Sequence, residues 1–386
     1  MSSPFCVLPW VHLATHPHGG VTLCCISDHT SCMNRARNVN EDGSETLLDL
    51  NRNSIEEIMN SDYYQTVRMQ MLSGVYPAAC RRCYNQEDSG IHSKRMEENA
   101  NYKLTEDEAR AITSPIGKID VDLRFVELRL GNVCNLKCRS CNPASSTKWK
   151  TEYRELQNKM PFVTKYDYEM DTSWTESDKF WEDLLVHSKN VEVIYINGGE
   201  PTLVEKHWGY LQRLIDAGLN EKVVLWYNIN MTNLPTKLLG IWRKFKEVRI
   251  SASIDDLYSR NDFIRTGSKW ADVERNLNVL LENPWLKTSI CQTVSSMNVW
   301  FLDEFYEYMT MERGLHVHHN FLHDPSFMSA ANLPDHQKIE LMSKLESSNR
   351  MEAWRLAAIR HYLSPKADLV KYQQYKDYMV WSRQHR

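Results

Sequence analysis

Short apolar runs alternate with segments of helical period along the chain from residue 125 onward. Runs typical of β-strands begin near Phe125, Val191, Val223, Val248, Ser289 and Leu315. Helical periods occupy residues 208–215, which end before Gly218, and residues 270–281 and 301–311. This alternation predicts parallel strands covered by helices, and six such units are too few to close an eight-stranded barrel. We therefore expect an α/β fold built on an open (β/α)6 partial barrel.

The first hundred residues follow a different pattern. Alternating apolar positions on either side of the Gly-rich segment 16–20 predict a β-hairpin. Ser54 and Glu57 have the spacing of a capping box, so we expect a helix that starts here and ends at residues 73–74. After residue 330 the pattern is again helical.

These patterns divide the chain into four expected parts. They are a small N-terminal α+β domain over residues 1–100, a charged connector over 101–124, the partial barrel over 125–330 and a helical C-terminal extension over 331–386. Parallel α/β sheets place their ligands at the carboxyl ends of the strands, so reactive residues are expected there.

Composition narrows the class of protein. The chain has 386 residues and a formal net charge of −4, which gives no electrostatic reason to expect nucleic-acid binding. It lacks a run of about 18 apolar residues, so no membrane span is expected. The N-terminus lacks the basic and apolar regions of a signal peptide. We therefore expect a cytoplasmic protein whose ten cysteines are reduced thiols, available for metal.

Cys134, Cys138 and Cys141 form a Cys-x3-Cys-x2-Cys run directly after the first apolar run of the barrel. Four thiolates would close a [4Fe–4S] cluster, whereas three leave one iron open for an external ligand. An open metal position distinguishes a reactive site from a purely structural one. The alternative is a structural zinc ion, or a closed cluster that takes a fourth cysteine from elsewhere.

The segment 131–141 resembles the cluster loop of the radical S-adenosylmethionine (SAM) enzymes. The resemblance implies that the open iron binds the amino and carboxylate groups of SAM. It also implies that one-electron reduction cleaves SAM and releases a 5′-deoxyadenosyl radical, which abstracts hydrogen from the substrate. One position differs, because Ser140 stands where the family usually has an aromatic residue that stacks on the adenine.

A second motif, Asn197-Gly198-Gly199-Glu200-Pro201, follows the next apolar run. Glycines at the end of a strand let the backbone approach a ligand closely, and a glutamate accepts a hydrogen bond from a cationic amine. The motif resembles the Gly-Gly-Glu sequence with which radical SAM enzymes bind the amino group of SAM. This implies a cofactor-binding role for Gly198, Gly199 and Glu200. Taken alone, the same sequence is more often a turn.

Ser253 and Asp255 lie at the end of a later strand and precede Arg265. This arrangement resembles the SPASM and twitch members of the radical SAM family, and it implies contacts with the carboxylate and ribose of SAM. An arginine suits a carboxylate because its guanidinium donates two parallel hydrogen bonds. The alternative is a solvated surface arginine with a capping Ser and Asp. The segment 230–233 resembles a further family motif but lacks its glycine.

The N-terminal region contains a second group of cysteines, namely Cys6, Cys24, Cys80 and Cys83. Their spacing resembles that of the twitch domain, a half-length form of SPASM, and implies an auxiliary [4Fe–4S] cluster held by these four thiolates. Cys25 and Cys32 are alternative ligands, although neighbouring side chains on a strand point to opposite faces. A tetrahedral zinc site is the alternative to the cluster.

Four histidines lie close together near the last predicted strand, namely His316, His318, His319 and His323. Imidazole fills many roles, so we expect ordinary polar contacts here and not a metal site. Cys291 lies within a predicted strand and is expected to be a buried small hydrophobe.

The resemblance as a whole implies a radical SAM oxidoreductase or modifying enzyme with two [4Fe–4S] clusters. Its substrate is expected to be a peptide or protein, or a small polar molecule, and its electron donor a small protein such as flavodoxin or ferredoxin. The rival interpretation is a non-catalytic iron–sulfur or zinc-binding redox scaffold that keeps the cysteines without turnover.

Overall fold

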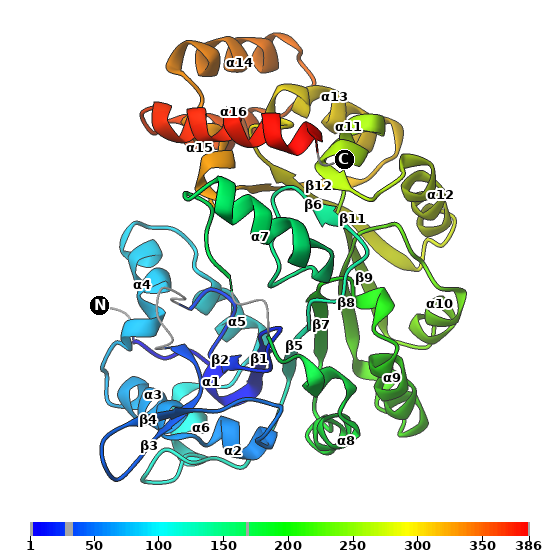
Figure 1. Cartoon of the computed structure of the whole chain (residues 1–386). Coiled ribbons are helices and arrows are strands. Elements are labelled where there is room, and N and C mark those ends of the chain that lie inside the picture. Colours follow the sequence, from blue (N-terminus) through cyan, green and yellow to red (C-terminus); the bar gives the residue numbers. More distant parts are fainter. Residues whose placement is uncertain (1–2, 28–33, 167–169, 385–386) are drawn as a thin grey trace.

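The computed structural model describes residues 3–27, 34–166 and 170–384. Within these residues, eight strands form one sheet in the order β12-β11-β9-β8-β7-β5-β1-β2 (Figure 1). The barrel strands are β5 (Phe125–Leu130), β7 (Val193–Gly198), β8 (Val224–Ile229), β9 (Glu247–Ala252), β11 (Leu286–Val294) and β12 (His316–Phe321). Neighbours among these six strands pair in parallel, so the predicted α/β fold with a six-unit partial barrel is confirmed.

The barrel strands separate an apolar face from a polar face. In β7, Ile194 and Ile196 are fully buried, whereas Tyr195 and Asn197 are half-buried. Alternate residues of a strand point to opposite faces, so the isoleucines pack against the outer helices and the polar residues face the inside of the barrel. The inner wall is therefore available for chemistry while the outer wall supplies the core.

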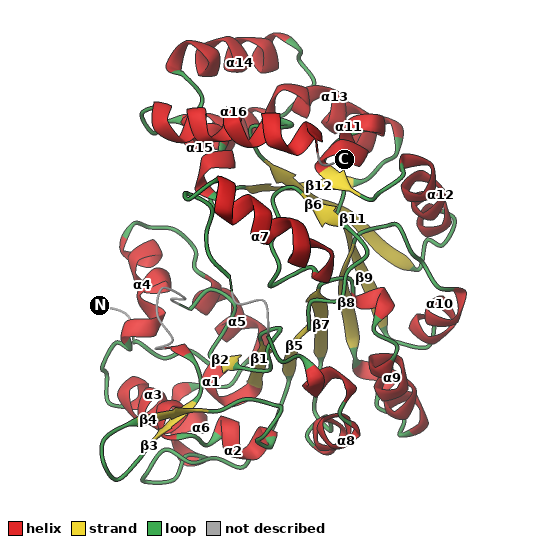
Figure 2. Ribbon diagram, viewed as in Figure 1, coloured by secondary structure: helices red, strands yellow, loops and turns green. Residues whose placement is uncertain are grey.

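Helices cover the outer face of the barrel sheet (Figure 2). They are α8 (Asp178–Val186), α9 (Lys206–Asp216), α10 (Thr236–Trp242), α12 (Trp270–Leu281) and α13 (Leu302–Tyr306), which continues as a π-helical stretch, Glu307–Glu312. The helix α11 (Tyr258–Ile264) instead packs against the short strand that follows it, β10 (Arg265–Thr266). The helix α12 has the predicted bounds. Trp181, Tyr210 and Trp242 are fully buried and form part of one large core with the strands.

The C-terminal extension is helical, as predicted. It consists of α14 (Asp335–Ser347), α15 (Ala353–Leu363) and α16 (Leu369–Gln384). The helix α7 (Lys150–Lys159) shares a second apolar cluster with α16, which lies above it in Figure 1. In the part of the chain that the structure describes, there is no helix with the length and apolar character needed to span a membrane.

The predicted N-terminal hairpin is present as β1 (His12–Thr15) and β2 (Val21–Thr22), after the short helix α1 (Leu8–Val11). The strand β1 also pairs in parallel with β5, and His12 lies opposite Phe125. The N-terminal region therefore extends the barrel sheet by two strands. The sequence pattern did not predict this pairing, because alternation within a strand carries no information about which distant strand it meets. Two further strands, β3 (Arg37–Val39) and β4 (Glu45–Leu47), form a separate ribbon.

The single helix expected from Ser54 to residues 73–74 is wrong in one respect, because it is broken. The capping box is present: the Ser54 hydroxyl accepts from Glu57 N, and the Glu57 carboxylate accepts from Ser54 N. However, α2 (Ile55–Met59) ends at Asn60, and α3 (Asp62–Leu72) begins after it. The Asn60 side chain donates to Ile119 O and accepts from Ile119 N, both at 3.0 Å. This tertiary contact holds the chain at the break.

The charged segment before the barrel contains more helix than its weak periodicity indicated. It carries α4 (Arg81–Asp88), α5 (Lys94–Tyr102) and α6 (Glu106–Ala111), and the last of these lies within the predicted connector. Thr105 and Glu108 form a complete capping box at the start of α6. The Thr-x-x-Glu spacing was the local signal that could have identified this helix.

The position of β1 in the barrel sheet predicts a large cost for truncating its core residue. Leu13 is fully buried, so Leu13→Ala should lower the free energy of unfolding by about 2–5 kcal/mol through lost burial and a residual cavity. Denaturant unfolding followed by circular dichroism measures this change. The control is Val39→Ala on the exposed ribbon, which should change it by less than about 0.5 kcal/mol. Equal midpoints for the two variants would show that β1 is not part of the cooperative core.

Candidate functional site

One cavity of about 440 Å³ opens at the carboxyl ends of the barrel strands. Every residue that the sequence predicted for the SAM cluster or for SAM itself lines this cavity. These residues are Cys134, Cys138, Cys141, Gly198, Gly199, Glu200, Ser253, Asp255 and Arg265. They come from loops far apart in the sequence, and the parallel sheet brings them together because its carboxyl ends share one edge.

The three cysteines lie on the loop between β5 and α7. Within it, β6 (Lys137–Cys138) pairs with β10 (Arg265–Thr266), and this register sets Cys138 opposite Arg265. Cys134 Sγ accepts a hydrogen bond from Leu136 N at 3.5 Å. Loss of hydration raises the pKa of Cys138 to about 12 and that of Cys141 to about 11. Without a metal these thiols therefore hold their protons, and a bound metal would supply the positive charge that stabilises the thiolate form.

The two glycines of the Gly-Gly-Glu motif pack against the cysteine loop. A Cβ at Gly199 would lie 2.2 Å from Val133 O, and Gly198 adopts φ of +130° with its Cβ position 2.7 Å from Leu130 N. The next residue, Glu200, donates its N–H to Val133 O at 2.8 Å. The sequence had related these glycines to the close approach of a ligand. In the structure, the group that comes close is the backbone of the cysteine loop.

Glu200 is fixed inside the cavity by three donors. Its Oε2 accepts from Asn230 N at 2.7 Å, and its Oε1 accepts from Thr202 N at 3.1 Å and Thr202 Oγ1 at 2.8 Å. The side chain is 1% exposed, and this burial raises the pKa of the carboxyl group to about 7. A cation bound beside it would favour the carboxylate form, so the site suits a positively charged group.

Asp255 and Arg265 form a buried ion pair at the same cavity. Arg265 Nη1 donates to Asp255 Oδ2 at 3.0 Å, and Asp255 Oδ1 accepts from Thr293 N at 2.9 Å. Arg265 is only 9% exposed, so it is not the solvated surface arginine of the alternative interpretation. Its buried Nε has no hydrogen-bond partner among the described residues, which leaves a donor for an anionic ligand. Asp255 is occupied by protein donors and holds Arg265 in place.

The segment 230–233 resembles a family motif without its glycine, and in the structure its side chains form hydrogen bonds with the cysteine loop. Asn230 Nδ2 donates to Asn135 Oδ1, and Asn135 Nδ2 donates to Thr232 Oγ1, both at 2.8 Å. Between them, Met231 adopts a positive φ of 66°. The missing glycine therefore did not remove the segment from the site. The signal that remained was a run of short polar side chains at a strand end.

The predicted N-terminal cysteines gather in a second, smaller cavity. Its lining includes Cys6, Cys24, Cys80 and Cys83, together with Lys94 and Arg95. Burial raises the pKa of Cys6, and it raises that of Cys24 to about 11. Cys25 does not line this cavity, and Cys32 lies outside the described residues. Within the described ranges, no three Cys, His, Asp or Glu side chains are grouped as the ligands of a single metal ion would be.

The histidines of β12 divide into exposed and buried positions. His316 and His318 are exposed, whereas His319 Nδ1 lies 2.8 Å from Gln292 Oε1 and burial lowers the pKa of His319 to about 3. The structure thus records a polar contact for His319 and exposed positions for His316 and His318. Cys291 differs from its prediction, because it is half-buried and its Sγ accepts from Asn320 Nδ2 at 2.9 Å. A polar partner on the neighbouring strand keeps this thiol from being a simple apolar filler.

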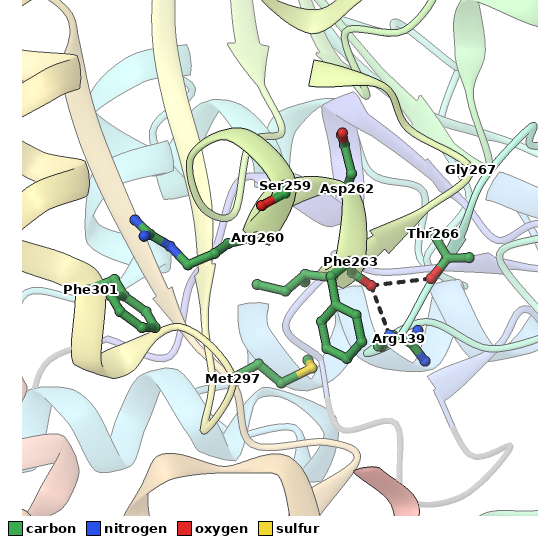
Figure 3. Close-up of a pocket in the computed structure, with 10 residues that line it drawn as sticks. Arg139, Ser259, Arg260, Asp262, Phe263, Thr266, Gly267, Met297 and Phe301 are labelled. Atoms are coloured by element: carbon green, nitrogen blue, oxygen red, sulfur yellow. Dashed lines mark hydrogen bonds between the residues drawn. The ribbon is translucent and has the colours of Figure 1, made fainter. Parts of the chain in front are cut away.

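A further cavity, of about 560 Å³, borders the cysteine loop at Arg139. Its lining includes Arg139, Phe263, Met297 and Phe301, and none of the predicted site residues. Figure 3 shows that the Phe263 carbonyl accepts from both Arg139 and Thr266. The hydrogen bond from Arg139 to Phe263 O therefore connects the cysteine loop to α11.

Residues 6–84 match the family model of SPASM, an iron–sulfur cluster-binding domain. This region is similar to a SPASM iron–sulfur domain. The match spans all four cysteines of the smaller cavity, and the prediction of an iron–sulfur domain at the N-terminus is confirmed.

Several solved structures are also similar to the chain. One is native anSMEcpe with bound AdoMet, with 17% identity over 58% of this chain and 59% of that chain and a TM-score of 0.41. Another is Streptococcus suis SuiB bound to the precursor peptide SuiA, with 14% identity over 85% of this chain and 69% of that chain and a TM-score of 0.38. The match thus spans less than two thirds of the length of anSMEcpe. No curated protein matches the chain.

The contact between Gly199 and the cysteine loop predicts that even one methyl group will disturb the loop. In Gly199→Ala the new Cβ must displace the backbone around Val133, so if the three thiols of this loop hold an iron–sulfur cluster, the variant should bind about four irons per chain fewer than the wild type. Iron and sulfide analysis after anaerobic reconstitution measures this loss. The matched control is Gly209→Ala on α9, where a Cβ meets no atom within 4 Å, and its iron content should equal that of the wild type. Equal iron in both variants would contradict the importance of this contact.

Proposed function

We propose that the chain is a radical SAM enzyme whose reactive [4Fe–4S] cluster is held by Cys134, Cys138 and Cys141. The observation that carries the proposal is the composition of the larger cavity. It contains three thiols, a buried glutamate and a buried arginine, and its described lining includes no further Cys or His. This donor set suits a cluster with one iron left for an external ligand.

The residues around the thiols fit the two charged ends of an amino acid. Glu200 offers a buried carboxylate to an ammonium group, and the unpartnered Nε of Arg265 offers a donor to a carboxylate. Ser253 lines the same cavity, with its N–H held by Ile229 O at 2.8 Å. SAM carries both an ammonium and a carboxylate group, so these residues would bind and orient it.

The chemistry itself belongs to the bound groups. When present, the cluster and SAM supply a one-electron reductive cleavage that yields a 5′-deoxyadenosyl radical for hydrogen abstraction. The chain holds the thiolates and binds the amino-acid end of SAM, and Glu200, Asp255 and Arg265 keep these charged contacts away from bulk water because they are buried.

Cys6, Cys24, Cys80 and Cys83 are proposed to hold an auxiliary [4Fe–4S] cluster. The SPASM match and the shared lining of one cavity support this assignment. A tetrahedral zinc site is the alternative for the same four thiolates, and the SPASM match favours the cluster.

The substrate is proposed to be a peptide or protein, or a small polar molecule. The support is the polar inner wall of the barrel beyond the SAM residues, where Arg129, Asn197, Asn228 and Thr293 line the cavity. Electrons would come from a small donor such as flavodoxin or ferredoxin, and seven free thiols at the two proposed cluster sites suit a reducing compartment such as the cytoplasm.

Production of 5′-deoxyadenosine separates the enzyme from a redox scaffold. The anaerobically reconstituted full chain, given SAM and a strong reductant, should release 5′-deoxyadenosine and contain about eight irons. Cys138→Ala should release none and retain about four irons, because only the auxiliary site remains intact. The control is Cys291→Ala, a thiol outside both cysteine cavities, which should match the wild type. A fully loaded wild-type protein that forms no 5′-deoxyadenosine would establish the scaffold.

The carboxylate of Glu200 should contribute to SAM affinity and not to cluster assembly. Glu200→Gln keeps the size of the side chain and one acceptor oxygen, but it removes the charge and one of the two backbone hydrogen bonds, from Thr202 N or from Asn230 N. A charge-assisted hydrogen bond is worth about 1.5–3 kcal/mol, so SAM should bind at least about tenfold more weakly. Anaerobic calorimetry measures the affinity, and iron analysis should show an unchanged cluster. Wild-type affinity in this variant would remove Glu200 from the SAM site.

A further inference from the structure

Three side chains bind backbone carbonyls of the cysteine loop. Ser146 Oγ donates to Leu136 O at 2.6 Å, and Trp149 Nε1 donates to Cys138 O at 3.0 Å. The third donor comes from the other end of the chain. The hydroxyl of Tyr378, on α16, donates to Arg139 O at 3.1 Å. The loop that carries the cysteines is thus held partly by the C-terminal helix.

Arg139, which lies between Cys138 and Cys141, is also held on its other side. Its N–H donates to Ile264 O at 2.8 Å, and its Nε donates to Phe263 O at 2.7 Å (Figure 3). Its guanidinium carbon lies 4.1 Å from the centroid of the Phe263 ring. With these contacts in place, the hydroxyl of Tyr378 completes the anchoring of this residue.

An apolar cluster surrounds the Tyr378 hydrogen bond. We call it the aromatic cap, and its buried aromatic members are Trp149, Tyr153, Phe327, Tyr378 and Trp381. Cys141 packs directly against it. Tyr378 is 1% exposed, so water does not reach its hydroxyl through the surface. The cap shields one side of the cysteine loop, and α16 supplies two of its aromatic rings.

We propose that Tyr378 is a positioning residue for the SAM cluster, and that α16 sets the reduction potential of this cluster by anchoring Arg139 and excluding water. The inference rests on the proposed function, because it concerns the cluster held by Cys134, Cys138 and Cys141. The potential of an iron–sulfur cluster depends on hydrogen bonding and solvent exposure around its ligands. A dry surrounding disfavours the extra negative charge of the reduced form, so the cap keeps the potential low.

The matched test compares two tyrosines on the same helix. Tyr378→Phe removes the hydroxyl that donates to Arg139 O, which loosens the contact between α16 and the cysteine loop and favours entry of water. Tyr372→Phe removes a hydroxyl that donates to Gln337 Oε1 on α14, away from the loop. Both variants are prepared as the anaerobically reconstituted full chain.

Two properties of the cluster are measured, namely its midpoint reduction potential and the rate at which it bleaches in air. A redox titration followed by electron paramagnetic resonance gives the midpoint potential of the signal that changes when SAM is added. Tyr378→Phe should shift this potential upward and speed the bleaching of the cluster in air by about five- to tenfold, the equivalent of one hydrogen bond. Tyr372→Phe should match the wild type in both measurements.

Other outcomes separate this inference from the proposed function. If Tyr378→Phe lowers thermal stability but leaves both the potential and the bleaching rate unchanged, Tyr378 is merely structural and the inference is overturned. If no signal responds to SAM in the wild type, the proposed function fails and the inference fails with it. If Tyr378→Phe does not fold, Trp149→Phe takes its place, since it removes the donor to Cys138 O and keeps an aromatic ring in the cap.

Discussion

The close backbone contact between the end of β7 and the cysteine loop is the constraint on which the site depends. Gly199 lies so near Val133 O that no side chain fits between them, and Glu200 N donates to the same carbonyl. This contact places the glutamate and the cysteine loop on one cavity wall. Close packing therefore requires glycine at positions 198 and 199, whereas the side chain at position 200 lines the cavity and can contact a ligand.

Burial of charge is the second constraint, and the site meets it with backbone donors. Asn230 N binds one oxygen of Glu200, and Thr293 N binds one oxygen of Asp255. Both donors lie at or near the ends of barrel strands, where N–H groups are no longer needed by the sheet. The Asp255–Arg265 pair then neutralises itself while leaving the arginine Nε without a partner. Such an arrangement holds buried charged groups at the cavity without satisfying all of their donors.

The two cysteine sites are connected by hydrogen-bonded strands. The strand β1 pairs with β5, the hairpin strand β2 leads directly to Cys24, and β5 leads directly to the cysteine loop. Their relative placement is therefore set by strand register and not by a linker. The C-terminal helix acts from the opposite side, through the bond between Tyr378 and Arg139. Both ends of the chain thus contribute to the surroundings of the cysteine loop.

The sequence by itself determined the features that depend on neighbouring residues. The barrel strands followed from local alternation, the start of α2 from the Ser54–Glu57 spacing, and the candidate ligands from the cysteine and Gly-Gly-Glu motifs. Only the tertiary structure decided the pairing of β1 with β5, the helix break at Asn60, the bracing role of segment 230–233 and the reach of Tyr378 to Arg139. Each of these depends on a contact between segments far apart in the chain. Periodicity and turn chemistry describe a residue and its near neighbours, so they contain no information about which distant backbone group that residue will meet.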